Sequence, residues 1–447
     1  MPWYFLVAGV LSVSIFFVYG QQVIREMSVR NIRKPENFEQ RLFFLSFLLR
    51  LAFTLLIYWV FRTVYDDLFG FEAADAAYYD SLGSFVADLM ENGNFHFYDE
   101  ITQWSGHDDV ADMGYGIYLG FIYLVTGKSV LAVRVLKCVW SSFTVILVYR
   151  LAQRNFGEQI ARMAAIFCAL WPNFWYYCSA HLKETEMVFL TVLYIEQADQ
   201  MLRSRRFTAW KVIPVLLIAA LIFTFRTPLG LVALLSLLFA LVMSSTRIVS
   251  WGKRVIVGIL AVALIGVAAG ERIEERVESL IEQVKGDQQQ YNMEWRSQRE
   301  HGNAFARYAS SAVFAPMIFT LPFPTMTKPY EEQQKQQLLN GGNFIKNILS
   351  LFTILALFSL LLSGSWRNHA LLLSFLLGYL VVLTLSSFPH SERFHQPVMP
   401  FEFILMAYGI SVATTDKKYK RWFYWWCGIM FVAAVAWNWF KMKGQGL

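Results

Sequence analysis

Long apolar segments follow one another from end to end of this 447-residue chain. Most are about 17 to 24 residues long, which is enough for a helix to cross the hydrocarbon core of a bilayer. They lack the alternation of polar and apolar positions that the strands of a membrane barrel would show. The pattern therefore predicts an all-α polytopic membrane protein with about 12 transmembrane helices. The predicted spans are 2–20, 42–64, 129–150, 159–178, 184–201, 211–226, 229–246, 253–270, 345–363, 368–385, 397–415 and 421–440.

Basic residues gather in every second loop between these spans, and loops of this kind face the cytoplasm. This regular alternation supports the predicted topology. Two of the remaining, outer loops are long, at 65–128 and 271–344. The predicted inner loops contain Arg25–Arg41, then Arg150, Arg154 and Arg162, then Arg203, Arg205, Arg206 and Lys211, then Arg247, Lys253 and Arg254, then Arg367, and finally Lys417–Arg421.

The first long outer loop is rich in acids and contains no Lys or Arg between Thr63 and Met113. A loop this long without a base is expected to face outward. The run Gly114–Gly127 is too short and too rich in glycine to span a bilayer, so it is predicted to be a helix lying in the outer interface. The acids of the loop are Asp66, Asp67, Glu72, Asp75, Asp80, Asp88, Glu91, Asp99, Glu100, Asp108, Asp109 and Asp112.

Composition narrows the class of protein further. Hydrophobic residues make up 56% of the chain, and the net charge of +6 resides mostly in short loops, so it indicates topology and lipid contact rather than nucleic-acid binding. The four cysteines lie in or at the ends of spans without the spacing of metal ligands, and no disulfide is implied. Sequence motifs of nucleotide-binding loops, serine hydrolases and zinc proteases are absent.

Asp75 is the first candidate for chemistry. A helix over 71–93 would place Tyr79, Leu82, Val86 and Leu89 on one face, with Asp75 one turn earlier on the same apolar face. Asp80, Asp88 and Glu91 would project from the opposite, wet face. A carboxylate on an apolar face is unfavourable unless it has a partner or a role. The alternative is that Asp75 only stabilises the N-terminus of its helix.

Basic residues on the outer side are exceptions to the charge pattern. Lys183, Arg226 and Arg393 each interrupt a short outer turn that otherwise lacks bases, and Arg296, Arg299 and Arg307 lie in the second long outer loop. Outer cations suit a phosphate or pyrophosphate, which arginine can bind with two parallel hydrogen bonds. The alternatives are contacts with lipid headgroups and local pairs, such as Lys183 with Glu186 three positions later. His181, His390 and His395 match no metal motif, so no metal site is predicted.

Several short motifs follow one another over about residues 41–205. They are Arg41–Val64, Asp75-Ala-Ala-Tyr-Tyr79, Gly114-Tyr115, Leu131-Ala-Val-Arg134, Val148–Gly157, Leu170-Trp-Pro-Asn173 and Lys183-Glu184. This series resembles the GT-C superfamily of integral-membrane glycosyltransferases. Within that superfamily it is similar to the bacterial relatives of dolichyl-phosphate-mannose protein mannosyltransferases and to lipid A aminoarabinose transferases. Arg393-Phe-His-Gln-Pro397 is a weaker match.

The resemblance implies that Asp75 is the essential acid of the first outer loop. Relatives often have a second acid next to it, where this chain has Ala76, so a metal held by an acid pair is not favoured and no cofactor is predicted. Many relatives also have a lysine shortly before the Gly-Tyr pair, where this chain has Asp112, so other cations must hold the donor phosphate. The predicted site is catalytic Asp75 with substrate-binding Tyr79, Lys183, Glu184, Arg226, Arg296, Arg299, Arg393 and His395.

The sequence thus predicts a plasma-membrane glycosyltransferase whose site faces the periplasm or cell exterior. Its partners are a polyprenyl-phosphate sugar donor, an acceptor that is a glycan, a lipid or a protein, and membrane lipids. Asp75 is predicted to act as general base in an inverting transfer. A flippase for a lipid-linked glycan and a glycan polymerase or ligase remain alternatives, and the first is disfavoured by the lack of charged residues at the centres of the spans. The predicted parts are an N-terminal anchor with a basic inner loop at 1–40, a catalytic core at 41–270, a covering outer loop at 271–344 and C-terminal helices at 345–447.

Overall fold

The computed structural model describes most of the predicted bundle. In this part of the chain every regular element is a helix, which confirms the all-α prediction for it. Most of the predicted span 2–20, nearly all of the span 253–270 and most of the loop 271–344 lie outside the described residues. The described residues are 10–11, 13–18, 38–70, 73–106, 113–204, 209–245, 252, 255, 259, 314–326, 335–386, 389–414 and 417–444.

Most helices of the N-terminal half follow the predicted apolar runs, and others lie in the acid-rich loop 65–128. They are α2 (Phe38–Val60), which continues into the π-helical turn η1 (Phe61–Tyr65), then α3 (Ala73–Glu91), α4 (Phe97–Ser105), α5 (Met113–Thr126), α6 (Val130–Phe156), α7 (Glu158–Leu170), α8 (Pro172–Ser179), α9 (Glu184–Arg203), α10 (Ala209–Phe225) and α11 (Thr227–Met243).

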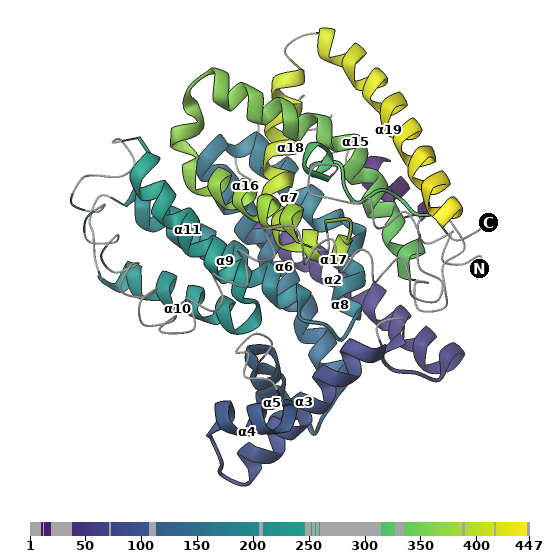
Figure 1. Ribbon diagram of the computed structural model, residues 1–447, viewed down its shortest axis with the longest axis vertical. Helices are drawn as coiled ribbons and strands as arrows, with labels where there is room; N and C mark the ends of the chain where they lie inside the picture. Colours follow the sequence, from purple (N-terminus) through teal and green to yellow (C-terminus); the bar gives the residue numbers. More distant parts are fainter. Residues whose placement is uncertain are drawn as a thin grey trace.

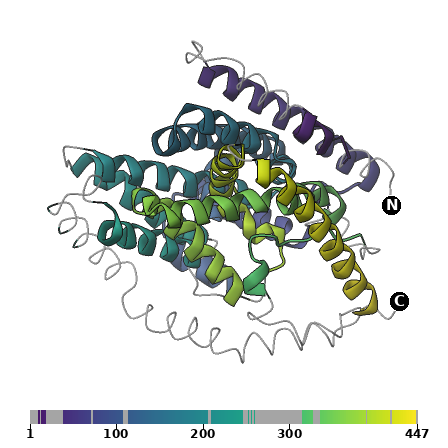
Figure 2. The ribbon, with the colours of Figure 1, turned by 90° about the horizontal axis from the view of Figure 1, so that it is seen from above.

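The C-terminal half follows the same pattern. Its helices are α15 (Lys335–Leu362), α16 (Ala370–Leu385), the short α17 (Glu392–His395), α18 (Met399–Ala413) and α19 (Lys417–Gly444). Helix α15 begins ten residues before the predicted start of its span, so the loop 271–344 is shorter than the sequence indicated. Helix α19 lies on the outer flank of the bundle in both views (Figures 1 and 2).

Helices α3, α4 and α5 form a separate small unit that projects from one end of the bundle (Figure 1). The unit is held together by helix α3, which packs along α5 with very little space between the two backbones. A Cβ atom added at Gly116 would lie 2.5 Å from Leu82, and one added at Gly120 would lie 2.5 Å from Val86. These glycines allow α3 to approach closely, which fixes the orientation of the helix that bears Asp75.

The loops that were predicted to share one side of the membrane do gather at one end of the bundle. At the end opposite α3, Arg203 donates a hydrogen bond of 2.7 Å to the Asn368 carbonyl, and Ser245 N–H donates to the Arg367 carbonyl at 3.2 Å. Arg154 forms an ion pair of 2.6 Å with Glu196 at the same end. The alternation of basic loops therefore corresponds to two real ends of the fold, while the side of the membrane that each faces stays a prediction.

One predicted span is not a continuous helix. The run 159–178 is not one helix but two, α7 and α8, because the backbone of Trp171 is extended and Pro172 starts a new helix. Proline lacks the N–H that would continue the hydrogen-bond ladder of the preceding helix.

The count of about 12 spans also stays a prediction. Among the described residues, four helical segments are long and apolar enough to cross a bilayer by themselves, and further apolar helices are shorter. The four are Phe38–Tyr65, Val130–Phe156, Leu338–Leu362 and Arg421–Met442.

The prediction that the spans lack interior charges is wrong. Arg50 is fully buried in the middle of α2, where it donates to the Ser141 hydroxyl at 2.7 Å and to the Cys168 carbonyl at 3.0 Å. Lys346 is buried between α15 and α18 and lies 3.4 Å from the Glu402 carboxylate. Each of these charges has partners on another helix, so they connect the helices of the bundle. Because the spans do contain interior charges, their charge content does not disfavour a transporter.

Candidate active site

Asp75 lies in the first turn of α3, at the end of the bundle where the small unit projects. The sequence around it, Ala73-Ala-Asp-Ala-Ala77, favours helix because alanine loses little side-chain entropy there. Tyr79, Leu82 and Val86 are buried on one face, as the periodicity predicted. Asp75 itself is 53% exposed, so it sits at the edge of this apolar face and not under it.

Arg393 connects Asp75 to a second carboxylate. The short helix α17 brings the guanidinium between α3 and the start of α9, where Nη1 donates to Asp75 Oδ2 and Nε donates to Glu184 Oε1. Burial lowers the pKa of Arg393, but the facing carboxylates outweigh it, led by Glu184, and the net pKa is raised, so the side chain stays charged. Two acids distant in the chain are thus joined through one cation.

Lys183 lies beside this pair, in the turn between α8 and α9. Its Nζ donates a hydrogen bond of 2.9 Å to the Phe225 carbonyl and lies 5.8 Å from the centre of the Tyr79 ring. Burial lowers the pKa of Lys183 to about 7; Arg226 and Arg393 act in the same direction, while Glu184 opposes them. Near neutral pH this amine therefore exchanges between a charged and an uncharged form.

Arg226 and Tyr79 complete the group. Arg226 lies between α10 and α11. Its guanidinium is 4.0 Å from the centre of the ring of Phe394, the residue that follows Arg393 in the sequence. Burial and the charge of Glu184 raise the pKa of the Tyr79 hydroxyl, which therefore stays protonated. We call Asp75, Tyr79, Lys183, Glu184, Arg226 and Arg393 the outer cluster.

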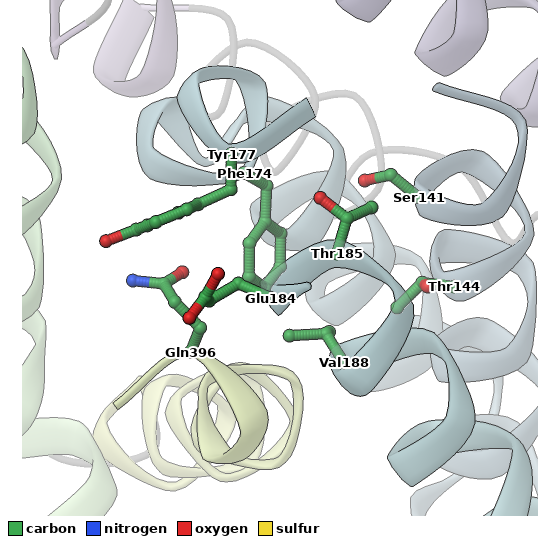
Figure 3. Close-up of a pocket in the computed structure, with 8 residues that line it drawn as sticks. All are labelled: Ser141, Thr144, Phe174, Tyr177, Glu184, Thr185, Val188 and Gln396. Atoms are coloured by element: carbon green, nitrogen blue, oxygen red, sulfur yellow. The ribbon is translucent and has the colours of Figure 1, made fainter. Parts of the chain in front are cut away.

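Glu184 borders a narrow cavity behind the outer cluster (Figure 3). Figure 3 shows its carboxylate close to the side chains of Gln396 and Tyr177. The carboxylate is 1% exposed, and its second oxygen, Oε2, has no hydrogen-bond partner among the described residues. A buried carboxylate with a single cationic partner holds that partner firmly, which fixes the position of Arg393.

The remaining predicted site residues are placed elsewhere. His395 is buried, and its Nε2 donates to the Pro389 carbonyl at 2.8 Å while its Nδ1 accepts from Lys346 at 3.0 Å. Both ring nitrogens are thus engaged, and a contact of His395 with substrate stays a prediction. Arg296, Arg299 and Arg307 lie outside the described residues.

The prediction for Asp80 needs correction. Its carboxylate accepts a hydrogen bond from the Tyr123 hydroxyl of α5 and lies 3.8 Å from His181, so it packs against α5 and is only partly exposed. Asp88 is on the wet face as predicted, where it forms an exposed ion pair of 2.8 Å with Lys128. The difference arises because α5 covers one flank of α3, which a helical projection of α3 alone does not reveal.

Sequence reasoning missed a second layer of charge beneath the outer cluster. Lys137 of α6 is fully buried, forms an ion pair of 2.9 Å with Glu186 and donates to the Leu182 carbonyl. The alternative in which Glu186 forms a local pair with Lys183 is therefore wrong, because Glu186 pairs with Lys137. Arg134, one turn before Lys137, donates to the Leu68 carbonyl. The spacing of Arg134 and Lys137, three positions apart within an apolar span, was the available signal.

A metal centre is not apparent in the described part of the chain. There, no group of three or more His, Cys, Asp or Glu side chains is placed to hold an ion.

The fold and site define a class of protein. An all-helical membrane bundle with a helical unit at one end, and with an acid and three cations at the base of that unit, has the features implied by the resemblance to the GT-C glycosyltransferases. A family model described as dolichyl-phosphate-mannose-protein mannosyltransferase matches residues 114–269. This match confirms the resemblance and supports the assignment of the chain as a membrane glycosyltransferase. A search among curated proteins found no match.

The matched region extends from α5 through α11 and beyond. It includes Lys183, Glu184 and Arg226, but not Asp75 or Arg393. The roles of individual residues therefore rest on the geometry of the outer cluster alone.

Proposed function

We propose that this protein transfers a sugar from a polyprenyl-phosphate donor to an acceptor hydroxyl at the outer face of the plasma membrane. The family description favours mannose as the sugar. The observation that carries the proposal is the outer cluster, in which one exposed carboxylate lies beside Lys183, Arg226 and Arg393. Such a lipid donor carries a single phosphodiester charge at the membrane surface, and convergent cations at that level suit it.

The cations have the position needed to hold the phosphate. Arg393 offers a planar fork for two phosphate oxygens, and Lys183 offers a compact charge a short distance away. Glu184 and Asp75 balance part of this positive charge, which favours an anionic ligand that brings one charge over one that brings several. The lipid tail would lie against apolar helix faces nearby, while the segment 271–344, with Arg296 and Arg299, is proposed to cover the site.

The reaction requires a base for the acceptor. Asp75 is proposed to accept the hydroxyl proton as the acceptor oxygen forms its bond to the anomeric carbon. The bond from that carbon to the phosphate oxygen breaks, and the phosphate leaves with the electron pair. Arg393 and Lys183 would stabilise the charge that develops on the leaving group. Direct displacement of this kind inverts the configuration at the anomeric carbon.

The contact between Arg393 and Asp75 links binding to catalysis. A phosphate that binds Arg393 competes with Asp75 for the same guanidinium. Once the phosphate has taken that hydrogen bond, the Asp75 carboxylate is available to accept a proton. Glu184, which is buried and bound to Nε, would hold the arginine in place during the exchange. Donor binding is therefore proposed to precede activation of the acceptor.

A transporter of lipid-linked glycans would also use outer cations. What favours a transferase is the exposed carboxylate within the cluster, together with the match to a glycosyltransferase family. A phosphate carrier gains nothing from an acid that competes for its main arginine.

Donor binding to purified variants tests the proposal. Replacing Arg393 by Ala should weaken the binding of polyprenyl-phosphate mannose by about ten- to a hundred-fold, the usual range for a charge-assisted contact. Arg393→Lys should restore part of the loss, because lysine keeps the charge but not the fork. Arg150 is the matched control, since it forms an exposed ion pair of 2.6 Å with Glu39 at the other end of the bundle. Equal affinities for Arg393→Ala and Arg150→Ala would refute the phosphate site.

A further inference from the structure

Three aromatic side chains form a partly exposed surface that begins at Tyr78, one turn after Asp75. Tyr78 and Phe85 lie on α3, and Trp104 lies on α4, which packs beside it (Figure 1). The rings of Phe85 and Trp104 are stacked, with centroids 5.6 Å apart and planes 17° from parallel. Tyr78 lies 5.8 Å from Trp104. Tyr78 and Trp104 are each 40% exposed, while Phe85 is more covered and supports them. We call these three residues the aromatic platform.

Helix geometry places Asp75 between the platform and the cations. Tyr78 and Tyr79 are the third and fourth residues after Asp75, so both lie one turn beyond it, and they diverge by about 100° around the helix axis. Tyr79 is buried and lies against Lys183. The Tyr78 ring lies 5.8 Å from Trp104 and also meets the Tyr79 ring edge-on, with centroids 5.6 Å apart. The carboxylate therefore has a cationic side and an aromatic side.

We infer that the aromatic platform binds a pyranose ring of a saccharide acceptor, which rests on the proposed transferase function. A pyranose has an apolar face of C–H groups that can cover an aromatic ring, while its hydroxyls remain at the rim. In a direct displacement the attacking hydroxyl and the leaving phosphate lie on opposite sides of the anomeric carbon. The base must then lie next to the acceptor, and the cations must lie across from it. Asp75 reaches this arrangement once the donor phosphate has replaced it on Arg393.

The charge of the surrounding loop favours a neutral or amino-bearing saccharide. No Lys or Arg occurs between Thr63 and Met113, and the described residues near the platform include the acids Asp99 and Glu100. An anionic lipid headgroup or an anionic polymer would be repelled there. Sugar hydroxyls, in contrast, can donate hydrogen bonds to such carboxylates. This charge distribution distinguishes the platform from aromatic residues that anchor a protein in anionic lipid.

Direct saccharide binding tests the inference. The probes are methyl α-mannopyranoside and a neutral mannotriose, observed by ligand-detected NMR with the full chain in a detergent that has no sugar headgroup. Trp104→Ala and Tyr78→Ala should each weaken mannotriose binding about ten-fold if roughly 50 Å² of ring surface is no longer covered. Trp104→Phe should keep most of the affinity. The control is Trp425→Ala on α19, whose side chain is 70% exposed and distant from the site.

Binding of the donor lipid to the same variants separates the outcomes. Unchanged donor affinity together with weakened mannotriose binding supports the platform as an acceptor site. The inference is overturned if neither saccharide binds the wild type, or if Trp104→Ala and Trp425→Ala have the same affinity for mannotriose. It is also overturned if a variant loses affinity for mannotriose and for the donor lipid to the same extent. The rings would then only anchor the unit at the interface. A wild type that binds mannotriose on these rings but does not bind polyprenyl-phosphate mannose supports a saccharide site and refutes the transferase proposal.

Discussion

At the scale of single residues, what distinguishes this site is that Arg393 joins two carboxylates of very different exposure. Asp75 is 53% exposed and Glu184 is 1% exposed. A buried carboxylate bound to a cation is a fixed partner, because leaving either charge alone in the interior is strongly unfavourable. An exposed pair is weaker and exchanges readily. The two acids can thus have different roles, Glu184 to hold the arginine and Asp75 to release it.

Replacement of Asp75 by Asn should separate binding from chemistry. The change keeps the shape of the side chain but removes the proton acceptor, so the transfer rate should fall by about a hundred-fold or more, the usual contribution of a general base. Donor affinity should stay the same or rise, because the competing carboxylate charge is gone. Turnover and donor binding are measured on the same purified protein.

Asp88→Asn is the control for this experiment. Asp88 lies on the same helix as Asp75 but forms only an exposed ion pair with Lys128. It should leave turnover unchanged. If Asp75→Asn keeps activity within a few-fold of wild type, Asp75 only stabilises the start of α3.

Lys183 should make donor binding depend on pH near neutrality. Burial lowers the pKa of Lys183 to about 7, below its ordinary value of 10.5. The protonated amine attracts the donor phosphate and the neutral amine does not, so affinity should be highest below pH 7 and should fall as the pH rises through 7. The donor phosphodiester keeps its charge over this range. Donor titrations at several pH values between 6 and 8.5 measure the effect.

Lys183→Met provides the comparison. It should bind the donor weakly at every pH, and its pH profile should be flat. A profile in Lys183→Met that falls as steeply as that of the wild type would assign the titration to another group.

At the scale of helices, the close contact between α3 and α5 fixes the direction in which Asp75 points. Two glycines of α5 contact Leu82 and Val86 of α3. Within the unit, α3 packs more extensively on α5 than on α4. Substituting either glycine should therefore move the acid relative to Arg393, which is held by a different part of the bundle.

Gly120→Ala tests this arrangement. Its new methyl group would lie 2.5 Å from Val86 Cγ1 and 3.3 Å from the backbone nitrogen of Ala87, so the helices must separate. Overpacking of this kind costs about 1–3 kcal/mol of stability. Turnover should decrease more than donor affinity, because Asp75 moves and the cations do not.

Gly428→Ala on α19 is the control, since no atom lies within 4 Å of its added methyl group, and it should change neither quantity. Loss of donor binding in Gly120→Ala equal to the loss of turnover would argue that the unit also shapes the phosphate site.

At the scale of the whole molecule, the turns that meet at the outer cluster belong to one end of the bundle and the basic loops belong to the other. The topology predicts that the cluster end faces outward. Cysteines introduced at Asn92, in the exposed turn after α3, and at Ser363, in the turn after α15, should be labelled differently by a membrane-impermeant thiol reagent. In intact cells only Asn92→Cys should react.

Cys427 should be replaced by Ser for this experiment, because it is the least buried of the four native cysteines. Labelling of Ser363→Cys alone would reverse the orientation and place the proposed site in the cytoplasm.

The membrane class of the protein and much of its local structure could be predicted from the amino-acid sequence. Hydropathy, the alternation of basic loops and the period of Tyr79, Leu82 and Val86 each depend on residues close together in the chain. Such patterns predict helices and ends of the bundle, and they singled out Lys183, Arg226 and Arg393 as unusual. They could not predict the break at Trp171, because a proline within a helical run can either kink the helix or end it.

Which of these residues meet depends on how the helices pack. Asp75 and Arg393 are 318 positions apart, and no local period relates them. Packing also decided that Glu186 pairs with Lys137 and not with nearby Lys183, and that His395 is hydrogen-bonded to Lys346. The physical reason is that a charge in a tightly packed bundle binds the partner that several helices bring within reach, and that geometry depends on the positions of all of those helices together.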